Sequence, residues 1–153
     1  ILLDAYINDA SEPLILQPYL QASEFGTDVY IDLISGEITD IFIKEKIRMR
    51  AGETEKSRSV KVPQIEEIIK KIIEVMPLRG PVDMDFFKYN DTYYLLEINP
   101  RFGGGYPHAF ACGINFPKNI SNNLSGKTNP CNIGNYKTDT YALKYTETYF
   151  MEQ

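Results

Sequence analysis

Side chains that carry oxygen recur at every second position in two neighbouring runs of this 153-residue chain. Asp83 and Asp85 alternate with apolar residues in the first run, and Glu97 and Asn99 do so in the second. Because strand side chains point alternately to two faces, each run is predicted to have one apolar face and one oxygen-rich face. Arg101 follows the second run directly. Carboxylate and amide oxygens are the ligands that Mg²⁺ or Mn²⁺ prefers, so this stretch is a candidate metal site.

The two runs are predicted to form a hairpin, and the length of its loop decides which faces meet. A two-residue turn would send Asp85 and Glu97 to opposite faces. A three-residue loop, Asn90–Thr92, would pair Asp85 with Glu97 and Asp83 with Asn99. The apolar pattern favours the longer loop, because that loop gathers five apolar side chains on one buried face: Val82, Met84, Phe86, Leu96 and Ile98. The alternative interpretation is a solvated acidic strand face.

An acidic residue on one strand, followed by Glu-x-Asn-Pro-Arg at the end of the next, resembles the metal-binding end of ATP-grasp enzymes. The resemblance is greatest to the carbamoyl-phosphate synthase large-subunit branch and extends from about Leu14 to Gly126. It implies that Asp85, Glu97 and Asn99 hold Mg²⁺ or Mn²⁺, and that Arg101 is catalytic and steadies the transferring phosphoryl group. The activity it implies is an ATP-dependent ligase, which activates a carboxylate or bicarbonate as an acyl or carboxy phosphate for capture by an amine or ammonia.

The segment Leu14–Leu20, LILQPYL, also resembles this family. The inter-lobe segment of the family supplies a polar side chain and backbone groups to adenine, and an acidic residue seven positions later binds the ribose. The resemblance therefore implies that Gln17 and Glu24 bind ATP, with backbone groups from Pro18, Tyr19 and Leu20. From the residues alone, the favoured interpretation is that Gln17 is a polar strand residue and Glu24 an acid in a turn.

The segment Arg48–Lys61 is polar and dense in charge and is predicted to be a loop. Its cations are candidates for a phosphate clamp, because cations must offset the triphosphate charge during transfer. A solvated loop of mixed charge is the alternative. The resemblance places such a loop over the nucleotide and favours Arg50, whereas no choice is made among Lys56, Arg58 and Lys61.

Periodicity predicts the remaining elements. Apolar residues three and four positions apart predict a helix over Pro63–Met76 that covers a sheet. Other strands are predicted over Leu14–Leu20, Glu24–Leu33, Ile38–Met49 and Thr138–Phe150, and shorter helices over Ile1–Ala10, Tyr106–Gly113 and Asn115–Leu124. The expected fold class is α+β, a mostly antiparallel sheet with helices on one face. The resemblance identifies it as the C-terminal lobe of an ATP-grasp domain.

Two features near the hairpin carry weaker predictions. The triple glycine Gly103–Gly105 is expected to let the backbone approach a substrate closely. His108, the only histidine, is a candidate general base. No acidic partner that would orient its ring is evident, so a structural role is favoured.

Composition limits the classes of function. Residues 1–153 suffice for a single domain, and because the chain starts at Ile1 we expect the N-terminal lobes of the family to precede it. A net charge of −5 argues against nucleic acid as the main partner, and no apolar run predicts a membrane span. Two cysteines, Cys112 and Cys131, suggest free thiols in a cytoplasmic protein. The alternative to an enzyme is a nucleotide- or metal-binding module without turnover.

Overall fold

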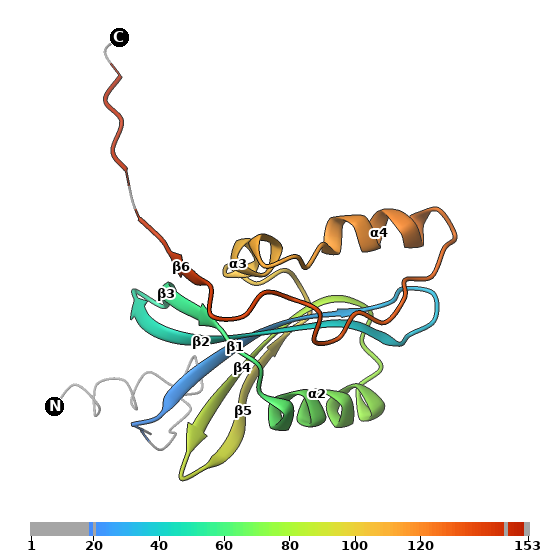
Figure 1. The fold of residues 1–153 in the computed structure, drawn as a ribbon, viewed down its shortest axis with the longest axis horizontal. Helices are drawn as coiled ribbons and strands as arrows, with labels where there is room; N and C mark the ends of the chain where they lie inside the picture. The colour runs from blue at the N-terminus through green and yellow to red at the C-terminus, as the bar shows by residue number, and fades with distance from the viewer. Residues whose placement is uncertain (1–18, 20, 146, 152–153) are drawn as a thin grey trace, which may run out of the picture.

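The computed structural model describes residues 19, 21–145 and 147–151. Within these residues the centre of the fold is a six-stranded sheet in the order β5-β4-β1-β2-β3-β6, with each neighbouring pair antiparallel (Figure 1). The strands are β1 (Ser23–Ile31), β2 (Ile38–Arg50), β3 (Glu53–Ser59), β4 (Gly80–Tyr89), β5 (Thr92–Asn99) and β6 (Tyr141–Leu143). The helices are α2 (Pro63–Val75), α3 (Tyr106–Ala111) and α4 (Phe116–Leu124). The predicted α+β class, with a mostly antiparallel sheet, is confirmed.

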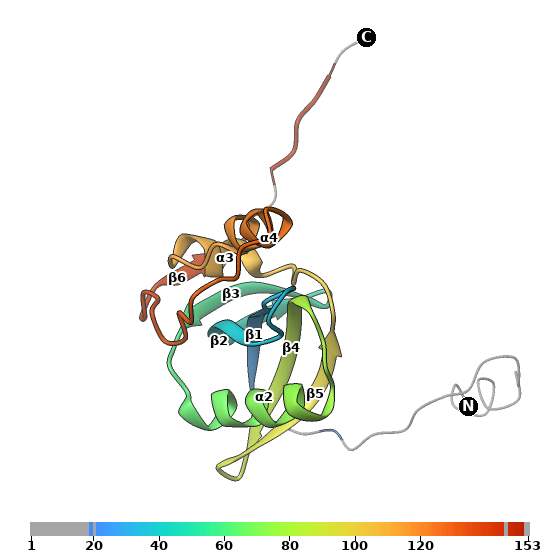
Figure 2. The ribbon, with the colours of Figure 1, turned by 90° about the vertical axis from the view of Figure 1, so that its right-hand side faces the viewer.

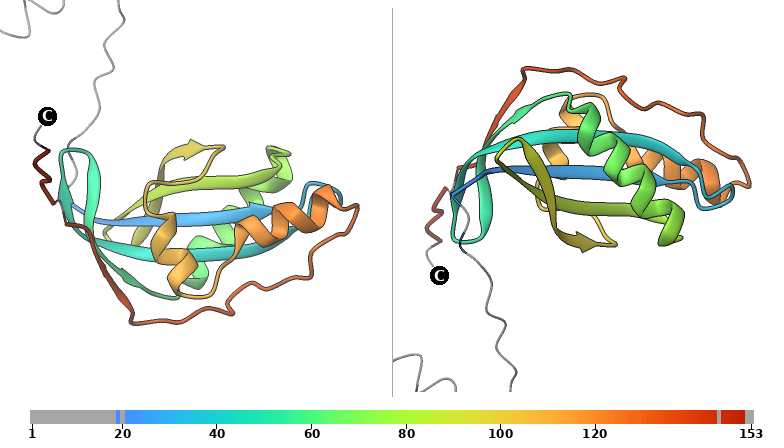
Figure 3. Two further views of the ribbon diagram at one scale, coloured as in Figure 1. Left: turned by 90° about the horizontal axis from the view of Figure 1, so that it is seen from above. Right: turned by 90° about the horizontal axis from the view of Figure 1, so that it is seen from below.

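Helices cover both faces of the sheet, whereas the sequence led us to expect them on one face. Helix α2 lies against one face, and α3 and α4 lie against the other (Figures 2 and 3). The reason lies in β1 and β2, whose central residues are buried on both faces. Val29 and Ile41 pack in the core beneath α2, while Tyr30 and Phe42 pack against the opposite pair of helices.

Helix α2 was predicted from its apolar spacing and is confirmed. It starts at Pro63, whose fixed φ suits the first turn, and Ile65, Ile69 and Ile73 are buried in the core below the sheet. These three side chains are spaced by four residues, so they form one stripe along the helix. The stripe closes one face of the sheet, so the acidic side chains of β4 lie on the opposite face, beside the apolar cluster under α3 and α4.

The hairpin turn is shorter than predicted. Tyr89 pairs with Thr92, so the turn consists of Asn90 and Asp91, whose φ angles of 48° and 57° are those a two-residue hairpin turn requires. The strand register then shifts at a β-bulge, where Leu96 is the extra residue. Leu96 is 39% exposed, so its predicted place in the buried set is wrong.

Two other boundaries differ from the predictions. The charged segment Arg48–Lys61 is not a loop: it forms the end of β2, a turn at Ala51 and Gly52, and strand β3. Strand β6 spans only Tyr141–Leu143 of the predicted Thr138–Phe150. The predicted helix Ile1–Ala10 and, apart from Tyr19, the predicted strand Leu14–Leu20 lie outside the described residues.

A buried carboxylate anchors α4 to the turn between β1 and β2. Oδ1 of Asp32 accepts hydrogen bonds from the backbone of Ile34 and Ser35, at 3.0 and 2.9 Å. Its Oδ2 accepts from the amide of Asn123 at 2.8 Å, and from the backbone and side chain of Asn129 at 2.8 and 2.9 Å. Burial would raise the pKa of Asp32, but these hydrogen bonds outweigh it and hold the pKa well below its ordinary value.

We expect Asp32→Asn to lower the free energy of unfolding by about 3 kcal/mol, because its amide group would face donors that now share a charged acceptor. Since the pKa of Asp32 is depressed, its contribution is full above the ordinary value of 3.8 and is lost as pH falls below it. The variant should therefore lose less stability on acidification than the unmutated protein. Urea unfolding followed by circular dichroism between pH 7 and pH 3 measures both effects.

Glu37→Gln is the matched control, because Glu37 is exposed in the same turn. Its expected effect is within about 0.5 kcal/mol. Equal stability of the unmutated protein and Asp32→Asn at pH 7 would contradict the anchoring role.

Candidate active site

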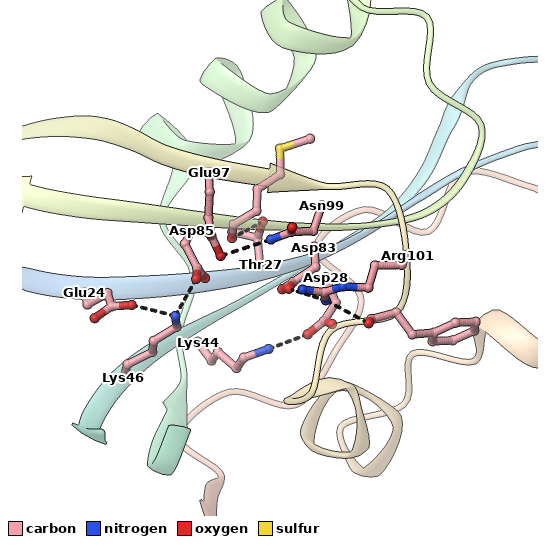
Figure 4. A network of polar contacts seen from close by, with 12 residues as sticks. Glu24, Thr27, Asp28, Lys44, Lys46, Asp83, Asp85, Glu97, Asn99 and Arg101 are labelled. Carbon is pink, nitrogen blue, oxygen red and sulfur yellow. Dashed lines mark hydrogen bonds and ion pairs between the residues drawn. The ribbon is translucent and has the colours of Figure 1, made fainter. Parts of the chain in front are cut away.

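The register of four strands gathers acidic side chains on the sheet face that α2 does not cover. Asp85 pairs with Glu97 and Asp83 pairs with Asn99, so both predicted pairings are confirmed (Figure 4). On the other side of β4, Asp83 pairs with Asp28 of β1. The bulge in β5 is what permits the first pairing, because a regular ladder from the two-residue turn would set Asp85 opposite Leu96.

A lysine of β2 separates the acids at one end of this face. Nζ of Lys46 lies 2.7 Å from Asp85 Oδ2 and 2.6 Å from Glu24 Oε1. Only 7% of the Lys46 side chain is exposed. Burial would lower the pKa of Lys46, but the hydrogen bonds and charges of Asp85 and Glu24 outweigh it and raise the pKa. Lys46 therefore remains charged and offsets the repulsion between these carboxylates.

Two further ion pairs stabilise the middle of the face. Lys44 Nζ lies 2.6 Å from Asp28 Oδ2, and both side chains are buried. Arg101 donates to Asp83 Oδ2 at 3.0 Å and to the carbonyl of Phe102. Burial, followed by the charges of Asp28 and Asp85, raises the pKa of Asp83. Asp83 thus holds Arg101 beside the metal-ligand candidates.

The triple glycine packs against these ion pairs. A Cβ at Gly103 would lie 2.6 Å from Asp83 Oδ1, and a Cβ at Gly105 would lie 2.7 Å from Lys44 Nζ. Any larger residue at these two positions would displace a charged side chain. Gly104 has no atom within 4 Å of an added Cβ and faces open space. The close approach predicted for the glycines is therefore made to protein side chains at two of the three positions.

A cleft of about 400 Å³ opens over this face. Asp83, Asp85 and Glu97 line it together with Arg101 and four other charged residues: Lys44, Lys46, Glu53 and Lys144. Glu53 and Lys144 form an ion pair with each other. The cleft thus combines hard oxygen ligands with several cations, a composition suited to a phosphate ester and its metal ion.

The charge balance of the face fits a divalent cation. It carries five carboxylates, Glu24, Asp28, Asp83, Asp85 and Glu97, against three cations, Lys44, Lys46 and Arg101, which leaves an excess of two negative charges. Among the described residues, no group of three or more His, Cys, Asp or Glu side chains is arranged to hold a metal. The candidate ligands are two carboxylates, Asp85 and Glu97, plus the amide of Asn99, which donates to Glu97 at 3.0 Å.

The predicted nucleotide-binding residues are spread more widely. Glu24 lies on the site face and pairs with Lys46, whereas Tyr19 is 89% exposed. Gln17, Pro18 and Leu20 lie outside the described residues. Arg50 is at the end of β2, its side chain 74% exposed and 3.5 Å from Glu55, and it is not among the residues that line the cleft.

The three cations among which the sequence gave no choice each have a partner within the protein. Lys56 lies over the ring of Tyr141, Arg58 pairs with Glu45, and Lys61 lies over the ring of Tyr136. Of the cations that line the cleft, Arg101 was predicted, whereas Lys44, Lys46 and Lys144 were missed. The sequence held a signal for two of them. Lys44 and Lys46 are two positions apart and therefore share one face of a strand, whereas the apolar Ile41 and Ile43 of the same strand point to its other face.

His108 has a structural environment. Its Nε2 lies 3.0 Å from the carbonyl oxygen of Thr140, and its Nδ1 lies 2.8 Å from the hydroxyl of Ser57. A carbonyl only accepts, so Nε2 carries the proton and Nδ1 accepts from Ser57. His108 therefore ties α3 to β3 and to the segment before β6.

Solved structures with a similar fold include a carboxyaminoimidazole synthetase and two biotin carboxylases. The chain is similar to N5-carboxyaminoimidazole synthetase from Staphylococcus aureus complexed with ADP (22% identity, TM-score 0.64, 80% of this chain and 34% of that one). It is also similar to a biotin carboxylase–β-γ-ATP complex from Campylobacter jejuni (14% identity, TM-score 0.65, 82% of this chain and 30% of that one). A third similar structure is the biotin carboxylase domain of a thermophilic 2-oxoglutarate carboxylase bound to bicarbonate (14% identity, TM-score 0.64, 80% of this chain and 30% of that one). The chain spans about a third of the length of these proteins.

These similarities to solved structures establish the fold, and a family model establishes the family. The chain belongs to the family described as ATP-grasp in the biosynthetic pathway with Ter operon, which matches residues 10–147. Among curated proteins, none matches the sequence. In the described part of the chain, no helix has the length and apolar character needed to span a membrane.

We expect Lys46→Met to lower the free energy of unfolding by about 2 kcal/mol, because Asp85 and Glu24 would lose their shared partner in a largely buried position. Chemical denaturation at pH 7 in low salt measures the loss. The matched control is Lys70→Met on α2, since Lys70 forms an equally short pair with Glu67, but at the exposed surface. Its effect should stay within about 0.5 kcal/mol, and similar losses in both variants would contradict the charge-balancing role of Lys46.

Proposed function

We propose that the chain is the ATP- and Mg²⁺-binding lobe of an ATP-dependent ligase. The observation that carries the proposal is the pairing of Asp85 with Glu97 beside Arg101, in one cleft of an ATP-grasp domain. The ligase activates a carboxylate or bicarbonate as an acyl or carboxy phosphate, which an amine or ammonia then captures. Solved structures of the same fold contain ADP and bicarbonate, which supports this class of reaction.

The charged residues around Asp85 and Glu97 each have a role in this proposal. Asp85, Glu97 and the oxygen of Asn99 hold Mg²⁺ or Mn²⁺, because hard oxygen ligands and an excess of negative charge favour a divalent ion. That ion, when bound, neutralises charge on the β- and γ-phosphates and orients them for transfer. Arg101, held by Asp83, stabilises the charge on the transferring group. Lys44 and Lys46 keep the surrounding carboxylates compatible with one another.

The bonds exchanged follow from the reaction class. A carboxylate oxygen of the acceptor attacks the γ-phosphorus while the bond from that phosphorus to ADP breaks. The amine nitrogen then attacks the activated carbon, phosphate leaves, and the nitrogen loses a proton. Both steps need water excluded from the cleft, since water would hydrolyse the activated intermediate.

The nucleotide-binding residues of this proposal are those predicted from the sequence. Gln17 and the backbone of Pro18, Tyr19 and Leu20 bind adenine in this proposal, Glu24 binds the ribose and Arg50 the phosphates. The chain acts as the C-terminal lobe, and lobes that supply a glycine-rich loop and lysines complete the site. The exposure of Arg50 supports its role, because its guanidinium is accessible to a ligand.

Among ATP-grasp ligases, we place the protein nearest the carbamoyl-phosphate synthase large-subunit branch. The order Glu97, Asn99, Pro100 and Arg101 supports this placement. Both cysteines are free thiols, one buried and one exposed, which is in keeping with a cytoplasmic protein.

Arg101→Ala in the full-length protein should lower the rate of ADP release by about 100-fold or more, with the KM for ATP changed by less than about threefold. An interaction that is stronger in the transition state than in the ground state appears in kcat rather than in affinity. The assay follows ADP release with bicarbonate or a panel of carboxylates, together with ammonia or amines.

Arg79→Ala is the control for this substitution, because Arg79 is exposed and does not line the cleft. Equal losses in ATP affinity and rate would mean that Arg101 only anchors phosphate in the ground state. Absence of ADP release from the unmutated protein with every acceptor would favour a binding module without turnover.

The metal ligands are tested by Mn²⁺ binding. Water-proton relaxation should detect a millimolar Mn²⁺ site that Glu97→Gln weakens at least about tenfold, because an amide replaces one of two charged ligands. Glu74→Gln on α2 lies on the far side of the sheet and should bind Mn²⁺ as the unmutated protein does. Equal binding by Glu97→Gln would refute the ligand assignment.

A further inference from the structure

A second, smaller cavity opens beside the cleft. It has a volume of about 150 Å³ and lies between β3, β6 and α3. We refer to it as the side pocket. Thr54, Gly104, Gly105 and Lys144 line both the side pocket and the cleft. The two spaces are therefore adjacent, so that a molecule whose reacting group lies in the cleft has the side pocket next to it.

One wall of the side pocket is apolar. Pro107 of α3 and Ala142 and Leu143 of β6 contribute to it. Ala142 pairs with Ser57 in the strand register, so both side chains point to the same sheet face. A cavity of about 150 Å³ with apolar walls holds a group the size of benzene.

The floor of the side pocket is polar but carries no charge. Ser57 donates its proton to Nδ1 of His108, and the Nε2 proton of His108 is directed at the carbonyl of Thr140. Burial, together with the charge of Lys44, lowers the pKa of His108, so its ring is neutral at pH 7. The ring and hydroxyl use their protons within the protein and present no cation to a ligand.

The two charged residues that line the side pocket, Glu55 and Lys144, each pair with a residue outside it. Lys144 forms an ion pair with Glu53, and Glu55 forms one with Arg48. Gly104 stands at the junction with the cleft, where nothing lies within 4 Å of an added Cβ. A methyl group at Gly104 would therefore meet no protein atom. A second carboxylate that entered the side pocket would lose hydration, because Lys144, the cation that lines it, already pairs with Glu53.

We propose that the side pocket binds the substituent of the acceptor, which is a carboxylate with an uncharged, largely apolar side chain of up to about six non-hydrogen atoms. This inference rests on the ligase function proposed above and names its substrate class. The carboxylate group lies towards Arg101, and the side chain passes Gly104 to reach Ala142 and Leu143. Bicarbonate, which has no substituent, would leave the side pocket unused.

The test uses the full-length protein and three carboxylate probes: acetate, isovalerate and glutarate. Binding is measured by saturation-transfer NMR in the presence of ADP and Mg²⁺. Isovalerate should bind at least about tenfold more tightly than acetate, because its isobutyl group packs against the apolar wall of the side pocket. Glutarate, whose chain of similar length ends in a second charge, should bind no more tightly than acetate.

Two variants narrow the side pocket from different sides. Ala142→Leu fills it from β6, and Gly104→Ala places a methyl group at the junction. Ala142→Leu should weaken isovalerate binding about tenfold and leave acetate binding unchanged. Gly104→Ala should weaken isovalerate binding about tenfold more than it weakens acetate binding. Ala111→Leu is the matched control, because Ala111 is exposed on α3 and lines neither space. If Ala142→Leu fails to fold, Gly104→Ala carries the test, since its added methyl meets no protein atom.

The outcomes separate this inference from the ligase function. Equal affinity for isovalerate and acetate, or unchanged isovalerate affinity in both variants, overturns the side-pocket assignment even where ADP release is seen. Preference for isovalerate that both variants abolish supports the assignment. If that preference occurs without ADP release from any acceptor, the binding site stands and the ligase function fails.

Discussion

Repulsion among five carboxylates on one sheet face is the constraint on which the site depends. Asp28 and Asp83 lie directly opposite each other on β1 and β4, and Asp85 lies opposite Glu97. Like charges in such positions destabilise a sheet unless cations lie close by. Lys44 and Arg101 each pair with one acid of the first couple, and Lys46 pairs with one acid of the second. The same arrangement that keeps the free protein stable leaves two negative charges unmatched, which is the charge of one divalent ion.

The pairing of Asp85 with Glu97 could be predicted, but by a route that was partly wrong. The turn is one residue shorter than predicted, and β5 is one residue longer because of the bulge at Leu96. Both changes shift the parity of the strand by one, so they cancel. The apolar pattern fixes which face of each strand is buried and therefore predicts the pairing. It does not distinguish an extra residue in the loop from an extra residue in the strand, because both restore the same alternation.

The sequence also contained a signal that helices cover both faces of the sheet, although the prediction placed them on one face. Val29, Tyr30 and Ile31 follow one another without interruption, as do Ile41, Phe42 and Ile43 in the next strand. A strand that is apolar at consecutive positions is buried on both faces. Anchors such as Asp32 were not predictable, because its partners Asn123 and Asn129 lie about ninety positions further along the chain. Nothing in the local pattern distinguishes such an acid from a solvated one.

The charge arrangement and the substrate-binding surface form one packed unit. Gly103 and Gly105 lie against Asp83 and Lys44 so closely that a methyl group at either position would displace a charged atom. The same short segment forms the edge of the cleft and of the side pocket. Both ion pairs therefore pack against the backbone segment that borders the cleft and the side pocket. Pairing on β1, β2 and β4 fixes these groups, whereas the side chain of Arg50, at the end of β2, is 74% exposed and lies 3.5 Å from Glu55. In the proposed reaction, the strands supply charge that is already in position, which is most effective when it needs no rearrangement. The turn between β2 and β3 supplies an accessible cation, Arg50.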